Sequence, residues 1–352
     1  MVEDFEMVEY FGQKMRECAA LITPHLTDRS PDAVVQGIIN GATYRNADET
    51  DFHYEDPLYN AIYMARYGYA YAYEYSTIYR IILEDYDDDI FGVTSLGCGS
   101  CIDAWALAYT NSKQSVWKSI RYAGTDLKVW GIQLKPEDGN VMERAYTNED
   151  GRVRMRYPGM NRMQDDLFSF YDNNRYQSLY NTVLFPKILN ELNPVDLASL
   201  LTIIRDHANE YTADRNRYIC ISHSRDAYNS QPAMRSIARE ICDAINYDNR
   251  FTVDDTLPGR WSGLGGGRRL NNVSPGEYAC YEFPLNQYRY YDRVEYLNSD
   301  FEVISEMSDV RNALDAYICT LPGRHGCVSS TSTSLFQIIK LSPAQRVMVG
   351  YQ

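Results

Sequence analysis

Apolar runs of strand length alternate along this chain with stretches of helical periodicity. The strand-length runs occupy residues 89–95, 120–127, 181–186, 217–222 and 336–341. Apolar side chains recur with a helical period in residues 102–109, 194–204 and 232–245. Alternating strands and helices of this kind bury a mainly parallel sheet between two layers of helices. The pattern therefore predicts an α/β fold, in which a doubly wound sheet carries helices on both faces.

The first part of the chain carries a different pattern. Apolar residues recur at helical spacing from Met7 to Ile22, and residues 32–39 are expected to form a short helix. Residues 1–88 are therefore predicted to be a mainly helical N-terminal cap. Residues 89–352 are predicted to be the sheet domain, with an elaboration at about 247–332 before the last strand.

A tyrosine stripe dominates the second half of the N-terminal region. Tyrosine recurs at every fourth position from Tyr59 to Tyr79, and residues at this spacing lie on one side of a helix. A period-two alternation within the stripe also permits a strand, but the intervening alanines favour a helix. The stripe either packs against the sheet or forms an aromatic lid, in which case Tyr63, Tyr67 and Tyr71 contact the substrate.

The chain turns at two glycines between the first predicted strand and the helix that follows it. Gly97 and Gly99 stand in the run Leu96-Gly97-Cys98-Gly99-Ser100. Glycine lets the backbone turn sharply and approach a ligand closely, because it has no Cβ. The first N–H groups of the following helix are available to a polar ligand. Strand, glycine turn and helix in this order predict the nucleotide-binding corner of a doubly wound sheet.

Acidic residues follow this corner at two places. Asp126 lies near the end of the run 120–127, where a carboxylate can accept hydrogen bonds from ribose hydroxyls. Asp165 and Asp166 form a second acidic group further along the chain. A glycine turn, an acid, an acidic pair and a further strand together indicate a nucleotide cofactor.

These segments resemble the motifs of class I S-adenosylmethionine (SAM)-dependent methyltransferases. The resemblance covers residues 88–250 and 333–343, roughly half of the chain. It implies a Rossmann-like sheet of about seven strands, SAM as cofactor and transfer of a methyl group. The positions that match the family's cofactor-binding motifs are Ser95, Gly97, Cys98, Gly99, Asp126, Leu127, Asp165, Asp166, Phe185 and Pro186. By this resemblance Asp126 binds the ribose, Asp165 or Asp166 binds the adenine amino group, and residues 181–191 lie beside the methyl donor.

The chain departs from the family pattern at three places. Ser95 stands where the family often has an acid, which leaves open how the amino end of the donor is held. Cys101 stands at the third glycine position, and the spacing from Gly97 to Asp126 exceeds the ~20 residues usual for such a corner. Two alternatives therefore stay open, namely a SAM-binding sensor or scaffold without turnover and an NAD-dependent oxidoreductase. The latter requires G-x-G-x-x-G, whose last position here is Ile102.

Methyl transfer from a sulfonium needs an aligned acceptor and the exclusion of water. A general base is required only when the acceptor is a protonated oxygen or nitrogen of high pKa. Lys187 and Glu191 follow one strand-length run and His223 follows another, so these three are the catalytic candidates. A salt bridge and a buried structural histidine are the alternative interpretations. The N-P-P-Y-type motif used on exocyclic base amines is absent from the sequence, which disfavours adenine and cytosine as acceptors.

The composition narrows the partners and the compartment. The 352 residues are 45% hydrophobic and carry a net charge of −14, so we expect a packed core and no nucleic-acid partner. Eight scattered cysteines, including Cys98 and Cys101, are expected to be free thiols of a cytoplasmic protein, with no metal site. No apolar run is long enough to cross a membrane. The expected acceptor is a small molecule or a protein, and the oligomeric state stays open.

Overall fold

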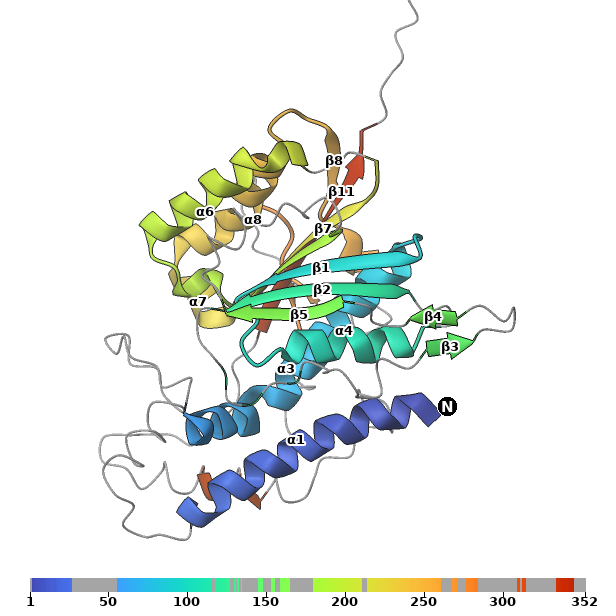
Figure 1. The fold of residues 1–352 in the computed structure, drawn as a ribbon. Coiled ribbons are helices and arrows are strands. Elements are labelled where there is room, and N and C mark those ends of the chain that lie inside the picture. The colour runs from blue at the N-terminus through green and yellow to red at the C-terminus, as the bar shows by residue number, and fades with distance from the viewer. Residues whose placement is uncertain are drawn as a thin grey trace, which may run out of the picture.

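The computed structural model of the chain describes most of the predicted sheet and its covering helices (Figure 1). The described residues are 2–26, 56–114, 118–126, 130, 132, 134, 145–147, 153–155, 159–164, 180–210, 214–260, 268–270, 277–283, 309–310, 312–314 and 334–344. The expected helix at 32–39 and the candidate residues Leu127, Asp165 and Asp166 lie outside them. Parts of the segment 247–332 also lie outside them.

A mixed sheet forms the centre of the molecule. Its strands are β1 (Ile90–Leu96), β2 (Ser119–Asp126), β5 (Gly159–Gln164), β6 (Thr182–Pro186), β7 (Arg217–Ser224), β8 (Phe251–Asp254), β9 (Arg268–Arg269), β10 (Tyr281–Glu282) and β11 (Ser334–Pro343). They lie in the order β5-β2-β1-β6-β7-β11-β10-β9, and β8 pairs with β11 beside β10. Strands β5, β2, β1, β6 and β7 are parallel, whereas β11 is antiparallel to β7 and to β8.

The strand order confirms the doubly wound prediction. From β1 the chain proceeds outward through β2 and β5, then returns to β6 on the other side and continues to β7. The carboxyl ends of β1 and β6 therefore mark the point where the winding direction reverses, which is where open α/β sheets bind ligands. A separate hairpin of β3 (Ala145–Thr147) and β4 (Val153–Met155) stands between β2 and β5 in the sequence.

Helices cover both faces of the sheet (Figure 1). On one face lie α6 (Pro194–Asp206), α7 (Arg225–Ser230) and α8 (Pro232–Ile245). Their apolar stripes share a hydrophobic cluster with Ile219 and Ile221 of β7. On the other face lie α3 (Pro57–Asp85) and α4 (Ile102–Ser112), with α1 (Val2–Leu26) outside them. Because both faces are covered, the central strands β1, β6 and β7 are buried along nearly their whole length.

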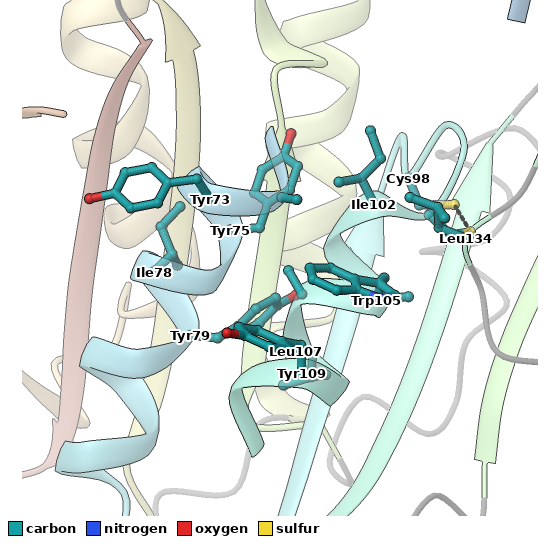
Figure 2. Packing of buried hydrophobic residues seen from close by; sticks show 14 of the residues in the cluster. Tyr73, Tyr75, Ile78, Tyr79, Cys98, Ile102, Trp105, Leu107, Tyr109 and Leu134 are labelled. Atoms are coloured by element: carbon teal, nitrogen blue, oxygen red, sulfur yellow. Dashed lines mark hydrogen bonds between the residues drawn. The ribbon is translucent and has the colours of Figure 1, made fainter. Parts of the chain in front are cut away.

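The tyrosine stripe is helical, as its alanine content predicts. Asp56 caps α3, because its carboxylate accepts hydrogen bonds from the N–H groups of Leu58 and Tyr59 at 2.7 and 3.1 Å. Pro57 occupies the first helical position, where its missing N–H costs nothing. Figure 2 shows side chains of α3 and α4 gathered between the two helices, among them Tyr79 and Trp105. Helix α3 thus shares one hydrophobic core with α4 and the sheet.

Short elements complete the described fold. They are the 3-10 turns η3 (Leu189–Glu191) and η4 (Ala208–Glu210) and the four-residue helix α9 (Leu257–Arg260). None of the helices that the structure describes has the length and apolarity needed to cross a lipid bilayer.

Candidate functional site

The glycine turn after β1 is held against the end of β2. The N–H groups of Gly97 and Cys98 donate to the carbonyl oxygen of Thr125 at 2.8 and 2.9 Å. Gly97 has a φ of 81°, and a Cβ there would lie 2.8 Å from Ile188 Cβ. Gly99 also has a positive φ, 54°. The turn therefore needs glycine at both positions, for conformation and, at Gly97, for space.

Asp126 stands beside this turn, as the sequence predicts for the end of the second strand. One of its carboxylate oxygens, Oδ2, accepts a hydrogen bond from the Gly99 N–H at 2.8 Å. The structure therefore places Ser95, Gly97, Cys98, Gly99 and Asp126 in one compact region at the carboxyl ends of β1 and β2. This region adjoins the switch point between β1 and β6.

A second carboxylate lies buried behind the turn, and the sequence analysis missed it. Asp103, the second residue of α4, is 1% exposed. The Tyr122 hydroxyl donates a hydrogen bond to its Oδ2 at 3.0 Å. Burial raises the pKa of Asp103 to about 6, although Ser95, Tyr122 and nearby backbone N–H groups favour the charged form. The sequence signal that could have identified Asp103 is its position as an acid in the otherwise apolar helix that follows the glycines.

The two cysteines of the turn are free thiols, and Cys101 donates a hydrogen bond to Cys98. Cys98 Sγ and Cys101 Sγ lie 3.8 Å apart, and both residues are buried (Figure 2). Cys101 has a φ of 58°, so the third glycine position of the motif keeps a left-handed backbone without a glycine. Burial raises the pKa of the Cys98 thiol, which keeps it protonated. No cluster able to hold a metal ion occurs among the described His, Cys, Asp and Glu residues.

A buried ion pair lies at the end of β6. Lys187 follows this strand with a φ of 64°, and its Nζ lies 2.9 Å from Oε2 of Glu74 on α3. The same Nζ donates to the Ser334 hydroxyl and lies 4.5 Å from the centre of the Tyr71 ring. Glu74 is fully buried and the Lys187 side chain is 12% exposed. Burial lowers the pKa of Lys187, and the Glu74 carboxylate opposes that shift.

His223 lies near this pair, close to the end of β7. Its Nε2 lies 2.9 Å from Oε1 of Gln337 on β11, and the Gln337 amide nitrogen donates to the Tyr278 carbonyl. This orientation of Gln337 makes Nε2 the protonated nitrogen and leaves Nδ1 with its lone pair. Burial lowers the pKa of His223 to about 4, and the Lys187 charge acts in the same direction. His223 is therefore neutral at physiological pH.

The remaining candidates after β6 occupy different environments. Phe185 is fully buried in the cluster under α6 and α8, so its side chain packs in the core. Pro186 is half-buried at the strand end, and Glu191 is exposed at the end of η3. Lys187 and Glu191 do not share a helix face, because η3 begins only at Leu189 and Lys187 is left-handed.

Aromatic side chains form a row between the glycine turn and the Lys187–Glu74 pair. Tyr63, Tyr67, Tyr71 and Tyr75 of α3, here called the tyrosine wall, form a continuous row with ring centroids 5.0, 5.2 and 6.1 Å apart. Tyr63 contacts Trp130 at 5.0 Å, and the Trp130 ring lies against Gly99. The tyrosine wall thus extends from the glycine turn to Lys187. Tyr63, Tyr67 and Tyr71 are half-buried, whereas Tyr75 is buried.

Comparisons with known proteins give a consistent but distant set. No protein-family model matches the chain, and no curated protein matches it. Solved structures include the plantazolicin methyltransferase BpumL in complex with SAH, at 10% identity and a TM-score of 0.33, over 95% of this chain and 99% of that one. A structure from Thermobifida fusca YX that is named as a methyltransferase gives 11% identity and a TM-score of 0.35, over 91% of this chain and 98% of that one. A structure from Nostoc punctiforme PCC 73102 that is named as an O-methyltransferase gives 14% identity and a TM-score of 0.31, over 92% of this chain and 71% of that one.

At TM-scores and identities this low, the fold is assigned from the strand order of this chain itself. The order β5-β2-β1-β6-β7-β11, with β11 antiparallel and β8 outside it, is a doubly wound Rossmann-like sheet. The last strand expected at residues 336–341 is β11, which lies beside β7 in the sheet.

Proposed function

We propose that this chain is a class I methyltransferase that uses SAM as its methyl donor. The observation that carries the proposal is the glycine turn held to the end of β2, with Asp126 on Gly99, at the switch point of the sheet. A cofactor with a ribose fits such a corner, because the half-buried Gly97 and Gly99 carry no side chains and Asp126 offers a carboxylate. SAM supplies a methyl group already activated as a sulfonium, so the protein needs chiefly to bind, orient and exclude water.

Several residues of this chain fit the donor. A Cβ on Gly97 or Gly99 would meet Ile188 or Trp130, so the glycines keep the turn close to its neighbours. Asp126 can accept hydrogen bonds from ribose hydroxyls while it keeps the one from the Gly99 N–H, since each carboxylate oxygen accepts more than one hydrogen bond. By resemblance, Leu127, Asp165 and Asp166 complete the adenosine site, and Ser95, Cys98 and Pro186 flank the donor. Phe185 contributes at most its backbone there, because its side chain packs in the core under α6 and α8.

The end of β6 and β7 is the proposed acceptor side. His223 is neutral and has a lone pair on Nδ1, and no hydrogen-bond partner for that atom occurs among the described residues. It can therefore accept a proton from an acceptor oxygen or nitrogen. Lys187, paired with Glu74, is close enough to His223 for its charge to help keep that imidazole neutral. Glu191 is the weakest of the three catalytic candidates, because its side chain is exposed.

The acceptor is proposed to be a small molecule or a protein side chain that contacts the tyrosine wall. Tyr63, Tyr67 and Tyr71 keep part of their surface exposed, and their rings offer flat apolar area with hydroxyl groups. The net charge of −14 opposes binding of a nucleic-acid backbone. A cytoplasmic location, with residues 1–88 as the cap and 89–352 as the donor-binding domain, belongs to the same proposal.

A SAM-binding protein without turnover is the second candidate. Glu74 of α3 reaches the end of β6 and pairs with Lys187 while both are buried, so α3 covers the acceptor side. If this cover does not open, SAM would bind without methyl transfer. Turnover with a panel of phenols, amines, carboxylates and peptides distinguishes the two, since only the enzyme converts SAM to S-adenosylhomocysteine.

Calorimetric titration with SAM, S-adenosylhomocysteine and NADH tests the donor assignment. We expect micromolar binding of the two adenosyl ligands and their loss in Asp126→Ala. Asp254→Ala is the matched control, because Asp254 also ends a strand of this sheet but lies at β8. Binding of NADH alone, or of none of the three ligands, contradicts the proposal.

A further inference from the structure

Asp103 is a buried carboxylate without a cationic partner. It is 1% exposed, and no ion pair to it occurs in the part of the chain that the structure describes. Its Oδ2 accepts from the Tyr122 hydroxyl, whereas its Oδ1 makes no hydrogen bond within the described residues. An isolated buried carboxylate is costly, so proteins normally pair it with a cation. A cation missing from the protein can be supplied by a ligand.

The surroundings of Asp103 are titratable but uncharged at neutral pH. Tyr122 of β2, Tyr75 and Tyr79 of α3 and Cys98 of the turn are near enough for the Asp103 charge to raise their pKa values. All four side chains therefore stay protonated. They surround the carboxylate without neutralising it.

Asp103 of α4 and Asp126 of β2 both lie near the glycine turn. Burial raises the pKa of the Cys98 thiol, and the charges of Asp103 and Asp126 act in the same direction, so the thiol is near both carboxylates. Gly124 of β2 gives room for this arrangement, because a Cβ there would lie 2.6 Å from the Tyr122 hydroxyl and 3.0 Å from Cys98 Sγ. Ser95, the last but one residue of β1, is close enough to Asp103 to favour its charged form.

We propose that Asp103 binds the α-ammonium group of the donor's amino-acid end, with Ser95 beside it. The inference rests on the proposed function. SAM carries an ammonium in addition to its sulfonium, and the other fully buried carboxylate of this region, Glu74, is already paired with Lys187. With Asp126 on the ribose, Asp103 is the buried carboxylate without a cationic partner that the described residues offer near the glycine turn for the ammonium. A carboxylate from the first turn of α4 thus replaces the acid that the sequence lacks at Ser95.

Burial of Asp103 means that the covering side chains must move when the ligand enters. The Ser100 hydroxyl contacts Met64 Sδ at 3.3 Å and so joins the turn to α3. We expect ligand entry to require that α3 and the turn separate at such contacts.

The test compares ligands that differ only at the amino-acid end. Calorimetry measures S-adenosylhomocysteine, its deamino analogue and 5′-methylthioadenosine against the wild type, Asp103→Asn and Asp126→Asn. We expect Asp103→Asn to weaken S-adenosylhomocysteine by about 10- to 100-fold, the range for a lost charged hydrogen bond, and to leave the other two ligands within about twofold. Asp126→Asn should weaken all three ligands alike, because each contains the ribose.

The other outcomes are decisive. Equal effects of Asp103→Asn on all three ligands, or no effect on any, overturn the role of Asp103 while the donor assignment stands. Failure of the wild type to bind every adenosyl ligand overturns the proposed function itself. If Asp103→Asn does not fold, the pH dependence of ligand binding by the wild type still tests the role of Asp103. Its preference for S-adenosylhomocysteine over the deamino analogue should decrease as the pH falls through about 6, where Asp103 takes up a proton. A preference that is constant between pH 5 and 8 overturns the inference.

Discussion

Lys187 Nζ lies 2.9 Å from Glu74 Oε2, and this contact joins the end of β6 to the middle of α3. One partner comes from the central sheet and the other from the tyrosine-rich helix. The pair therefore ties the N-terminal region directly to the proposed acceptor side. Its burial makes it sensitive to the loss of either partner, because the remaining charge would have no counterion.

Glu74→Gln should destabilise the protein strongly. The change removes the counter-charge of the buried Lys187 ammonium, whose other neighbours among the described residues, the Ser334 hydroxyl and the Tyr71 ring, are neutral. Removing one partner of a buried pair costs about 3–5 kcal/mol. Urea unfolding measures the free energy of unfolding. Glu84→Gln, at an exposed position of the same helix, is the control and should change it by less than about 0.5 kcal/mol.

A double variant checks the physical cause. Glu74→Gln with Lys187→Met removes both charges and should recover most of the lost stability, since no isolated charge stays buried. If the double variant is as unstable as Glu74→Gln, the loss comes from packing of α3 and the ion pair is not its cause.

Local signals account for the elements that the sequence predicts well. Asn193 and Pro194 predict the start of α6, and Asn193 Oδ1 accepts from the N–H groups of Val195 and Asp196 at 2.9 Å each. The predicted helix at 232–245 coincides with α8. Both predictions depend on neighbours within one or two helical turns, so the sequence contains all the information they need.

The acceptor side could not be predicted in the same way. The sequence suggests a Lys187–Glu191 pair only if the intervening residues are helical, but Lys187 is left-handed and its partner is Glu74. That contact depends on how α3 packs over the sheet, which no local pattern encodes. The sequence did not single out Asp103 for a related reason. Its isolation from cations becomes evident only when β2, α3 and the turn are assembled.

Replacing Gly97 by alanine should distort the turn. Its φ of 81° is unfavourable for alanine, and the new Cβ would lie 2.8 Å from Ile188. We expect a loss of about 1–3 kcal/mol in the free energy of unfolding, together with weaker binding of S-adenosylhomocysteine. Adding Ile188→Ala should recover the part due to the steric contact and leave the part due to φ. A Gly97→Ala variant with wild-type stability and affinity would contradict this account of the turn.

His223 should make the stability of the protein fall in acid. Its folded-state pKa is lowered to about 4 by burial, below the ordinary value near 6.5, so the unfolded state binds its proton first. The stabilisation that neutral His223 gives the folded protein is therefore present above about pH 6.5 and is lost as the pH falls towards 4. The shift corresponds to about 3 kcal/mol. Urea unfolding of the wild type and His223→Gln should show a difference that shrinks over this range.

The matched control for this series is His25→Gln, in the last turn of the outer helix α1. We expect its difference from the wild type to change little between pH 7.5 and 4. If the His223→Gln difference is equally constant, burial of a neutral His223 is not responsible for any acid sensitivity.

Asp103 should act on stability in the opposite sense, which separates a binding role from a structural one. Burial raises its folded-state pKa to about 6, above the ordinary value of 3.8. The folded protein therefore holds this proton more tightly, and the stabilisation present at low pH is lost as the pH rises through 6. Asp103→Asn resembles the protonated form, so it should be more stable than the wild type at pH 7.5 by up to about 3 kcal/mol. This gain should disappear near pH 4, as measured by urea unfolding at both pH values. A residue retained for packing would give a variant that is less stable at pH 7.5. A variant that gains stability there but loses affinity for S-adenosylhomocysteine would show that the charge of Asp103 serves the ligand at the expense of the fold.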